Sequence, residues 1–207
     1  MAVTAQQVKE LRDATGAGPL DCKKALESTN GDFDKAVGLL REKGLAKAAK
    51  KLGAGRAMNE GIVETYQHFN RRLAVIVEVN CETDFVANTE RFRAFAKDIS
   101  LHIANLNPEY IKREDVPEAV AEAERQLQRR RAIEEGKPEA VADKIVAGRM
   151  DKFFQEIVLM EQPFLKDDTK TIKQLLGELV AEVGESVEIR RFARFALGES
   201  TDEQSGE

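Results

Sequence analysis

The sequence predicts an α+β protein, with an N-terminal three-helix bundle followed by an α/β core in which helices pack a small antiparallel sheet. Three observations predict this class. Apolar residues recur at helical spacing in three short segments before residue 52. Two β-branched runs, residues 61–66 and 73–79, are separated by a short polar connection. Amphipathic helical segments then fill most of the chain, up to a last alternating strand at residues 187–197.

Local sequence features place the ends of the three N-terminal helices. Thr4 and Gln7 form a capping box at the start of the first helix, and Gly16 ends it. Pro19 suits the first position of the second helix. Asp32 is expected to cap the third helix, whose apolar residues follow at helical spacing.

The bundle and the core are predicted to be separate domains. The Gly-Ala-Gly sequence at residues 53–55 is typical of a flexible linker. We therefore predict a three-helix domain at residues 1–55 and an α+β core at residues 56–197, including a helical segment near residues 108–160. The polar, acidic residues 198–207 are predicted to be a disordered tail.

The first half of the core is expected to contain a hairpin and a long helix. The connection between residues 61–66 and 73–79 contains Asn70, which is expected to adopt a left-handed turn conformation. The second strand should be central, because it is apolar on both faces. Asn88 is expected to cap the following helix. The apolar stripe of that helix is Phe92, Phe95, Ala96, Ile99, Ile103 and Leu106.

The second half of the core is predicted to be mainly helical. A charged helix starting at Pro117 has only Val120, Leu127 and Ile133 as apolar anchors, so we expect it to be exposed or to face a partner. A richer helix, or a helix pair interrupted at Gly148, follows, and its aromatic residues are expected in the core.

Three further segments complete the core. Residues 159–165 are predicted to be an extended apolar loop. Thr171 and Gln174 then cap a helix that Gly184 closes, and the last strand follows.

Composition limits the classes of function. The 207 residues are 42% hydrophobic, enough for one sizeable core and a small satellite domain. The net charge of −5 argues against broad binding to nucleic acid or anionic membranes, which requires a concentrated positive field. The sequence has no apolar run near the roughly 20 residues that span a bilayer, and its start lacks the pattern of a signal peptide. We therefore expect a cytoplasmic protein.

No motif for catalysis or for a cofactor is found. His102 lies on the apolar face of its helix, where a hydrogen-bonded packing role is expected. Phosphate-loop, dinucleotide-binding and zinc-protease motifs are absent. Cys22 and Cys81 have no metal-binding spacing and are expected to be reduced thiols. Asp84 has no neighbouring carboxylate for an acid/base pair. We therefore expect a binding protein that is not an enzyme and has no cofactor.

Residues 78–88, Glu-Val-Asn-Cys-Glu-Thr-Asp-Phe-Val-Ala-Asn, place an acid and an aromatic at a corner between the central strand and a helix. Phe85 at such a corner is either a plug for the protein's own core or a wedge for a partner. The residues alone favour the plug, because apolar corner residues usually pack inward.

Residues 190–195 alternate arginine with aromatic residues and suggest RNA stacking. On a strand, Arg191 and Phe195 would lie on one face and Phe192 on the other. Neither face is then an aromatic platform, so a sheet strand with partly solvated arginines is favoured.

Two long motifs resemble elongation factor Ts, the bacterial guanine-nucleotide exchange factor of elongation factor Tu. One is residues 11–26, Leu-Arg-Asp-Ala-Thr-Gly-Ala-Gly-Pro-Leu-Asp-Cys-Lys-Lys-Ala-Leu, and the other is residues 78–88 with their Thr-Asp-Phe-Val centre. Residues 158–167 also resemble the family, and the order of the three motifs fits over residues 1–197. The length matches the shorter members, which have one core subdomain.

The resemblance implies that the bundle is similar to ubiquitin-associated domains and docks on the G domain of elongation factor Tu. The implied docking residues are Leu11, Arg12, Thr15, Gly16, Gly18 and Lys23. The alternative is that the loop is merely a tight helical connection. Pro19 stands where the family commonly has methionine or another bulky apolar residue, which leaves open whether Pro19 or Leu20 makes the apolar contact.

The resemblance also reverses the interpretation of the corner. An exchange wedge would insert near the magnesium and phosphate site of elongation factor Tu and loosen GDP without covalent chemistry. Its residues are Thr83, Asp84, Phe85 and Val86. Val79, Cys81 and Val86 are expected to fix the corner in place.

The sequence also suggests a homodimer and two rival functions. A homodimer would supply the second subdomain of longer members, through strand edges or the charged helix at residues 117–135. One rival function is a general adaptor that uses the ubiquitin-associated-like segment at residues 4–52. The other is an enzyme whose pocket is built from scattered polar residues. No direct nucleic-acid or membrane partner is expected.

Overall fold

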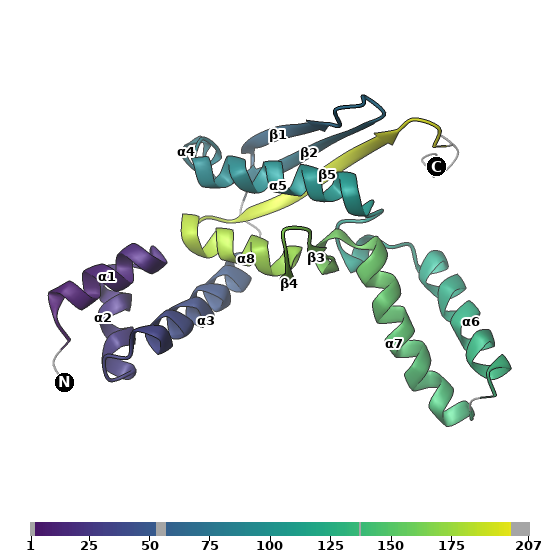
Figure 1. Cartoon of the computed structure of the whole chain (residues 1–207), viewed down its shortest axis with the longest axis horizontal. Helices are drawn as coiled ribbons and strands as arrows, with labels where there is room; N and C mark the ends of the chain where they lie inside the picture. Colours follow the sequence, from purple (N-terminus) through teal and green to yellow (C-terminus); the bar gives the residue numbers. More distant parts are fainter. Residues whose placement is uncertain (1–2, 53–56, 137, 200–207) are drawn as a thin grey trace. The chain divides into compact units, whose positions relative to one another are not determined.

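The computed structural model describes residues 3–52, 57–136 and 138–199 (Figure 1). The chain forms two compact units. The first contains Met1–Ile62, Val79–Phe95 and Gln174–Arg190, and the second contains Val63–Glu78, Ala96–Lys173 and Arg191–Glu207. The predicted linker at residues 53–55 and residues 200–207 of the predicted tail lie outside the described residues. The mixture of helices with a small antiparallel sheet confirms the predicted fold class.

Three helices form the predicted N-terminal bundle in the first unit. They are α1 (Ala5–Thr15), α2 (Pro19–Ser28) and α3 (Phe33–Leu52). Their apolar faces enclose a small core of Leu11, Cys22, Ala25, Leu26, Ala36 and Leu40.

The predicted ends of these helices are confirmed. The Thr4 hydroxyl accepts a hydrogen bond from the backbone N–H of Gln7 at 3.3 Å, which completes the capping box. Gly16 ends α1 with a φ of 66°, a conformation that glycine adopts without a steric penalty. The Asp32 carboxylate accepts from the backbone N–H of Lys35 at 3.1 Å at the start of α3.

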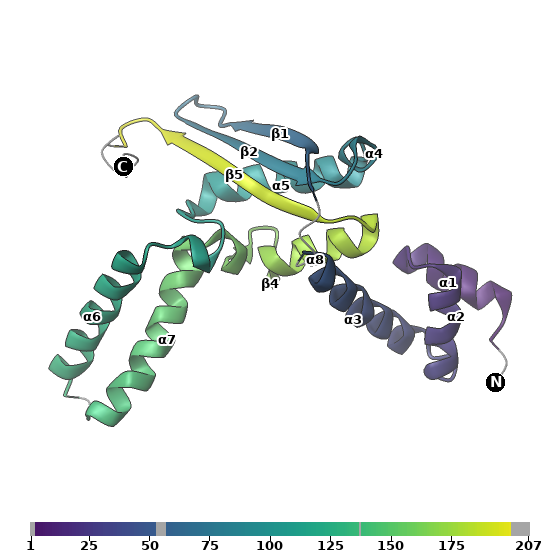
Figure 2. The same cartoon turned by 180° about the vertical axis from the view of Figure 1, so that it is seen from behind.

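The three-stranded sheet has the order β1-β2-β5. Its strands are β1 (Glu60–Gln67), β2 (Leu73–Cys81) and β5 (Val187–Ala196), so β2 is central as predicted. The strand was expected to be central because both of its faces are apolar. In the structure only alternate side chains of β2 are buried, and Ile76 on the other face is 46% exposed. The views in Figures 1 and 2 agree that α5 runs along one face of this sheet.

The turn between β1 and β2 corrects one prediction. Arg71, and not Asn70, adopts the left-handed conformation, with a φ of 59°. Asn70 instead uses its side-chain oxygen to accept from the backbone N–H of Arg72 at 3.0 Å. Its short polar side chain therefore stabilises the turn without taking the left-handed position itself.

Two helices follow β2 where one was predicted. They are α4 (Asp84–Ala87) and α5 (Glu90–Leu106). Asn88 lies at the end of α4, and the Thr89 hydroxyl accepts from the backbone N–H of Phe92 at the start of α5, at 3.3 Å. The prediction that Asn88 caps the long helix was therefore wrong, because a short helix intervenes. The apolar stripe of α5 is buried as predicted, except for Leu106, which is 40% exposed.

His102 is fully buried on α5 and has the predicted packing role. Its Nδ1 accepts from the backbone N–H of Leu165 at 3.2 Å, so its Nε2 carries the proton and donates to Oε1 of Gln162 at 2.9 Å. Burial lowers the pKa of the imidazole, which keeps the ring neutral.

A helical hairpin in the second unit contains α6 (Glu118–Glu134) and α7 (Glu139–Ile157), after a short 3-10 turn, η1 (Arg113–Asp115). The two helices lie side by side. Their contact does not use all the predicted anchors, because Val120 and Ile133 are 37% and 56% exposed. The buried residues of α6 are Ala121 and Ala132. Small side chains let helix backbones approach closely, which explains why these alanines are buried and the larger Val120 and Ile133 are not. The chain does not break at Gly148, which lies inside α7.

The end of the second unit contains a small sheet that the sequence did not predict. After a 3-10 turn, η2 (Leu159–Glu161), β3 (Pro163–Phe164) pairs antiparallel with β4 (Asp167–Thr171). The prediction of an extended loop was thus incomplete. Then α8 (Ile172–Val183) ends at Gly184, which has a φ of 74° as expected for a glycine that terminates a helix.

Candidate partner-binding sites

The corner after β2 exposes Phe85 on a short, well-capped helix. Thr83 precedes α4 with an extended backbone, and its hydroxyl accepts from the backbone N–H of Val86 at 3.3 Å. The side chain of Phe85 is 78% exposed, and Asp84 beside it is exposed as well. The plug interpretation is therefore wrong, because this phenyl ring does not pack into the protein's own core.

Buried residues on both sides hold this corner. Val79 and Cys81 are fully buried at the end of β2, and Val86 is only 4% exposed. The Cys81 thiol donates to the backbone carbonyl of Thr83 at 3.1 Å, and burial raises the pKa of this thiol, which keeps the proton in place. These residues fix the corner as predicted. Because Val86 is buried, it supports the short helix that carries Phe85 and does not present a contact surface.

A second chain segment contributes to the corner. The carboxylate of Glu185 accepts from the Thr83 backbone N–H at 3.1 Å and from the Thr83 hydroxyl at 2.8 Å. In return, the Glu82 carboxylate accepts from the backbone N–H of Ser186 at 2.8 Å. Sequence reasoning missed Glu185, because it lies on an ordinary helix-to-strand turn and nothing local connects it with Thr83.

The loop between α1 and α2 is compact. The Thr15 hydroxyl donates to the backbone carbonyl of Leu11 at 2.6 Å and accepts from the backbone N–H of Ala17 at 3.4 Å. The buried Cys22 thiol donates to the carbonyl of Ala17 at 3.5 Å. Gly18 has a φ of −61°, so its backbone conformation does not require glycine.

The predicted docking residues differ in their exposure to solvent. Arg12, Gly16, Gly18 and Lys23 are exposed, and Thr15 is half-buried. Leu11 is fully buried in the bundle core, so it supports the loop and cannot contact a partner in this conformation. Leu20 is 64% exposed at the start of α2, which makes it a large apolar side chain available beside the loop.

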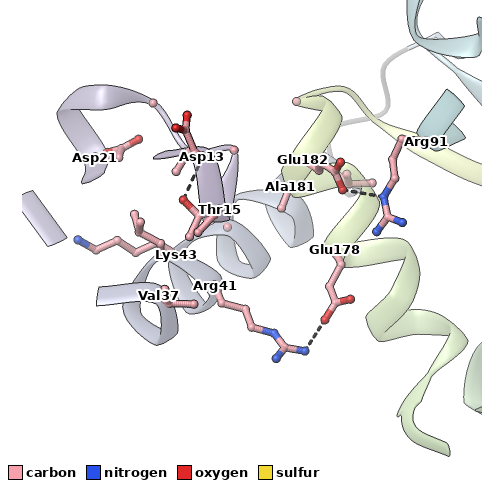
Figure 3. Close-up of a pocket in the computed structure, with 18 residues that line it drawn as sticks. Asp13, Thr15, Asp21, Val37, Arg41, Lys43, Arg91, Glu178, Ala181 and Glu182 are labelled. Carbon is pink, nitrogen blue, oxygen red and sulfur yellow. Dashed lines mark hydrogen bonds and ion pairs between the residues drawn. The ribbon is translucent and has the colours of Figure 1, made fainter. Parts of the chain in front are cut away.

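A groove of about 700 Å³ lies between this loop and α8, within the first unit (Figure 3). Arg41 of α3 forms an ion pair with Glu178 of α8, and Arg91 Nε lies 2.7 Å from Glu182 Oε2. At the close approach of α3 to α8, a Cβ on Gly44 would lie 3.1 Å from the Cβ of Ala181.

Neither the groove nor the corner has the side chains of a metal site. No group of three or more His, Cys, Asp or Glu in the described part of the chain could hold a metal ion. Within the same residues, no helix is long and apolar enough to cross a membrane. Phe85 and Leu20 are the most exposed large apolar residues of the first unit among the described residues, and such side chains are suited to contact with another protein.

Comparison with known proteins agrees with the two motifs. Residues 4–199 match the family model described as elongation factor TS. The chain belongs to the elongation factor Ts family. Elongation factor Ts from Carboxydothermus hydrogenoformans is 56% identical over 197 residues, covering 95% of this chain and 90% of that protein. The Thermoanaerobacter protein is 56% identical over 205 residues, covering 99% of this chain and 100% of its own length. That of Geobacter sulfurreducens is 52% identical over 207 residues, covering 100% and 95%.

Membership of the elongation factor Ts family confirms the resemblance drawn from residues 11–26 and 78–88. It also supports a role for the chain as a translation elongation factor. The coverage is close to complete in both directions, so the likeness is not restricted to one domain.

The exposure of Phe85 leads to a prediction about stability. Phe85→Ala should change the free energy of unfolding by less than about 0.5 kcal/mol, because the ring is mostly in solvent. Phe92→Ala is the matched control and should cost roughly 3–5 kcal/mol, because Phe92 is fully buried. Urea unfolding followed by circular dichroism would compare them. An equal loss in both variants would mean that Phe85 packs inward after all.

Proposed function

We propose that the protein is a guanine-nucleotide exchange factor, which binds elongation factor Tu in the cytoplasm and accelerates release of GDP. The observation that carries the proposal is the 78% exposure of Phe85 on a helix whose other apolar residues, Val86 and Ala87, are buried. Leaving a phenyl ring in water forgoes its burial free energy, of the order of 2 kcal/mol. Burial in a partner would recover that energy.

The wedge consists of Asp84 and Phe85 at the front of α4. Insertion of the ring between helices of the partner's G domain would shift them between discrete packing arrangements, since packed interfaces do not deform smoothly. The shift would weaken the magnesium and diphosphate contacts of GDP. The capped helix supports this role, because it presents the ring without further ordering of its backbone.

The exchange needs no covalent step. If the protein weakens GDP binding by some factor, GDP weakens binding of the protein by the same factor. Release of GDP and rebinding of a nucleotide therefore form a cycle in which the protein is regenerated.

Phe85→Ala should lower the maximal rate of GDP release by about tenfold or more, the typical effect of removing an aromatic anchor from an interface. The measurement is release of fluorescent GDP from elongation factor Tu at increasing concentrations of each variant. Phe69→Ala is the matched control, because Phe69 is 87% exposed on the turn between β1 and β2, in the second unit, and does not belong to the corner. Release by Phe85→Ala at the native rate would refute the wedge.

The N-terminal loop is proposed to dock on the same partner. Arg12, Gly16, Gly18 and Lys23 are exposed around it, and Leu20 supplies the apolar side chain. Docking by this loop adds affinity without entering the nucleotide site, so it should change the concentration dependence of exchange and not its limiting rate.

Leu20→Ala should raise the concentration of protein that gives half-maximal GDP release by roughly tenfold, while the rate at saturation stays close to native. Leu165→Ala is the control, because Leu165 is 43% exposed in the second unit and outside the loop. The same titration with fluorescent GDP gives both quantities. A native half-saturation for Leu20→Ala would remove Leu20 from the docking surface.

A homodimer is proposed for the second unit. Each of the three strands exposes a large apolar side chain that a second copy of the chain would cover. They are Val63, Ile76 and Phe195, which are 64%, 46% and 61% exposed. This surface differs from the strand edges and the charged helix named from the sequence, since it lies on the strand faces.

Light scattering at micromolar concentration should give about twice the chain mass of 23.1 kDa. Ile76→Lys should shift the mass to that of one chain, because an unpaired charge at a dimer interface is costly. Leu106→Lys, at a 40% exposed position on α5, should remain dimeric. A native mass of one chain would rule out the dimer at that concentration.

A further inference from the structure

Thr83 has two hydrogen-bonding roles at the wedge. Its hydroxyl oxygen accepts from the Val86 backbone N–H at 3.3 Å, which caps α4, and its hydroxyl proton goes to Oε1 of Glu185 at 2.8 Å. Its backbone N–H goes to the other carboxylate oxygen, Oε2, at 3.1 Å. A hydroxyl has one proton, so donation to Glu185 leaves its lone pairs for the N–H of α4. The carboxylate therefore orients the cap.

Glu185 is itself held in a defined position. Gly184 ends α8 in the left-handed conformation, with a φ of 74°, and so turns the chain toward the corner. Ser186 is 1% exposed, and its backbone N–H donates to the Glu82 carboxylate at 2.8 Å. Residues 82–83 and residues 185–186 thus each donate hydrogen bonds to the other segment. We call this set of bonds the corner clamp.

The helix that carries Phe85 depends on such support. With four residues, α4 is far below the length at which an isolated helix is stable in water. Val86 and Ala87 fix its inner side by burial, whereas Asp84 and Phe85 are exposed and are held by the Thr83 cap. Loss of the cap would free the turn that contains Asp84 and Phe85.

We propose that Glu185 is a positioning residue for nucleotide exchange, which acts through Thr83 to set the direction of the Phe85 side chain. The inference rests on the proposed function of Phe85 and extends it to a segment about 100 residues away in the sequence. Glu185 need not touch the partner, because its effect is on the pre-organisation of α4.

Glu185→Gln is the direct test. The amide has the size of the carboxylate, but only one of its two polar atoms accepts, so one of the two Thr83 donors loses its partner. The maximal rate of GDP release from elongation factor Tu should fall roughly five- to tenfold, with half-saturation changed by less than about twofold. Glu188→Gln, three residues along on β5, is the matched control and should exchange at the native rate.

Measuring the maximal rate and the half-saturating concentration separately distinguishes a positioning role from a merely structural one. A smaller folded fraction would raise the half-saturating concentration but leave the rate at saturation unchanged. Thr83→Ser keeps the hydroxyl and should exchange much faster than Thr83→Val, which lacks it. Thr83→Val removes the hydroxyl and should exchange slowly. In the Thr83→Val background, Glu185→Gln should add much less than it does alone, since the two side chains form one hydrogen-bonded unit.

The outcomes are distinguishable from those of the proposed function. If Phe85→Ala is slow and Glu185→Gln reaches the native maximal rate, the positioning role is refuted and the wedge stands. If Phe85→Ala itself releases GDP at the native rate, the proposed function fails first. An equal loss in Glu188→Gln, or additive losses in the Thr83→Val background, would also overturn the role of Glu185.

Discussion

The structure depends on burial of one face of β2, the central strand of the three-stranded sheet. Alternate residues of this strand, from Val75 to Cys81, are fully buried, whereas Ile76 between them is exposed. A strand with one buried face has its register fixed, because a shift by one residue would expose every buried side chain. The last buried residue, Cys81, therefore comes at a fixed point. The backbone leaves the sheet there and enters the corner.

The corner that follows this fixed strand end holds the Phe85 side chain at a defined position in solvent. Two residues before the exposed ring the chain is anchored through Thr83, and one and two residues after it Val86 and Ala87 are buried. The ring is the one large apolar side chain of α4 left in solvent. Local order on both sides and exposure between them are the properties expected of an interface anchor. Pre-organisation lowers the entropic cost of binding, and it would do so here on a helix of one turn.

The same unit also contains the N-terminal loop, and α8 contacts elements that support both features. Glu178 of α8 pairs with Arg41 of the bundle, and Glu182 pairs with Arg91 just after the corner. Three residues after Glu182, the Glu185 carboxylate accepts two hydrogen bonds from Thr83. Individually, exposed ion pairs add little to stability. Together, Glu178 and Glu182 of α8 and Glu185 in the turn after it link this segment to the bundle, to α5 and to the corner.

The sequence determined the features that depend on neighbours along the chain. The capping box of α1, the glycines that end α1 and α8, and the apolar stripe of α5 up to Ile103 were predicted correctly, because each depends on residues within a few positions of one another. The two motifs also identified the family, because long runs of specific residues remain visible without a structure. Tertiary structure decided that Phe85 is exposed and is not a plug for the protein's own core, since exposure depends on what distant segments cover. It also decided that Leu11 and Val86 are buried, that Ala121 and Ala132 are the buried residues of α6, and that Glu185 bonds to Thr83. Such contacts link residues far apart in sequence, and local pattern carries no information about them.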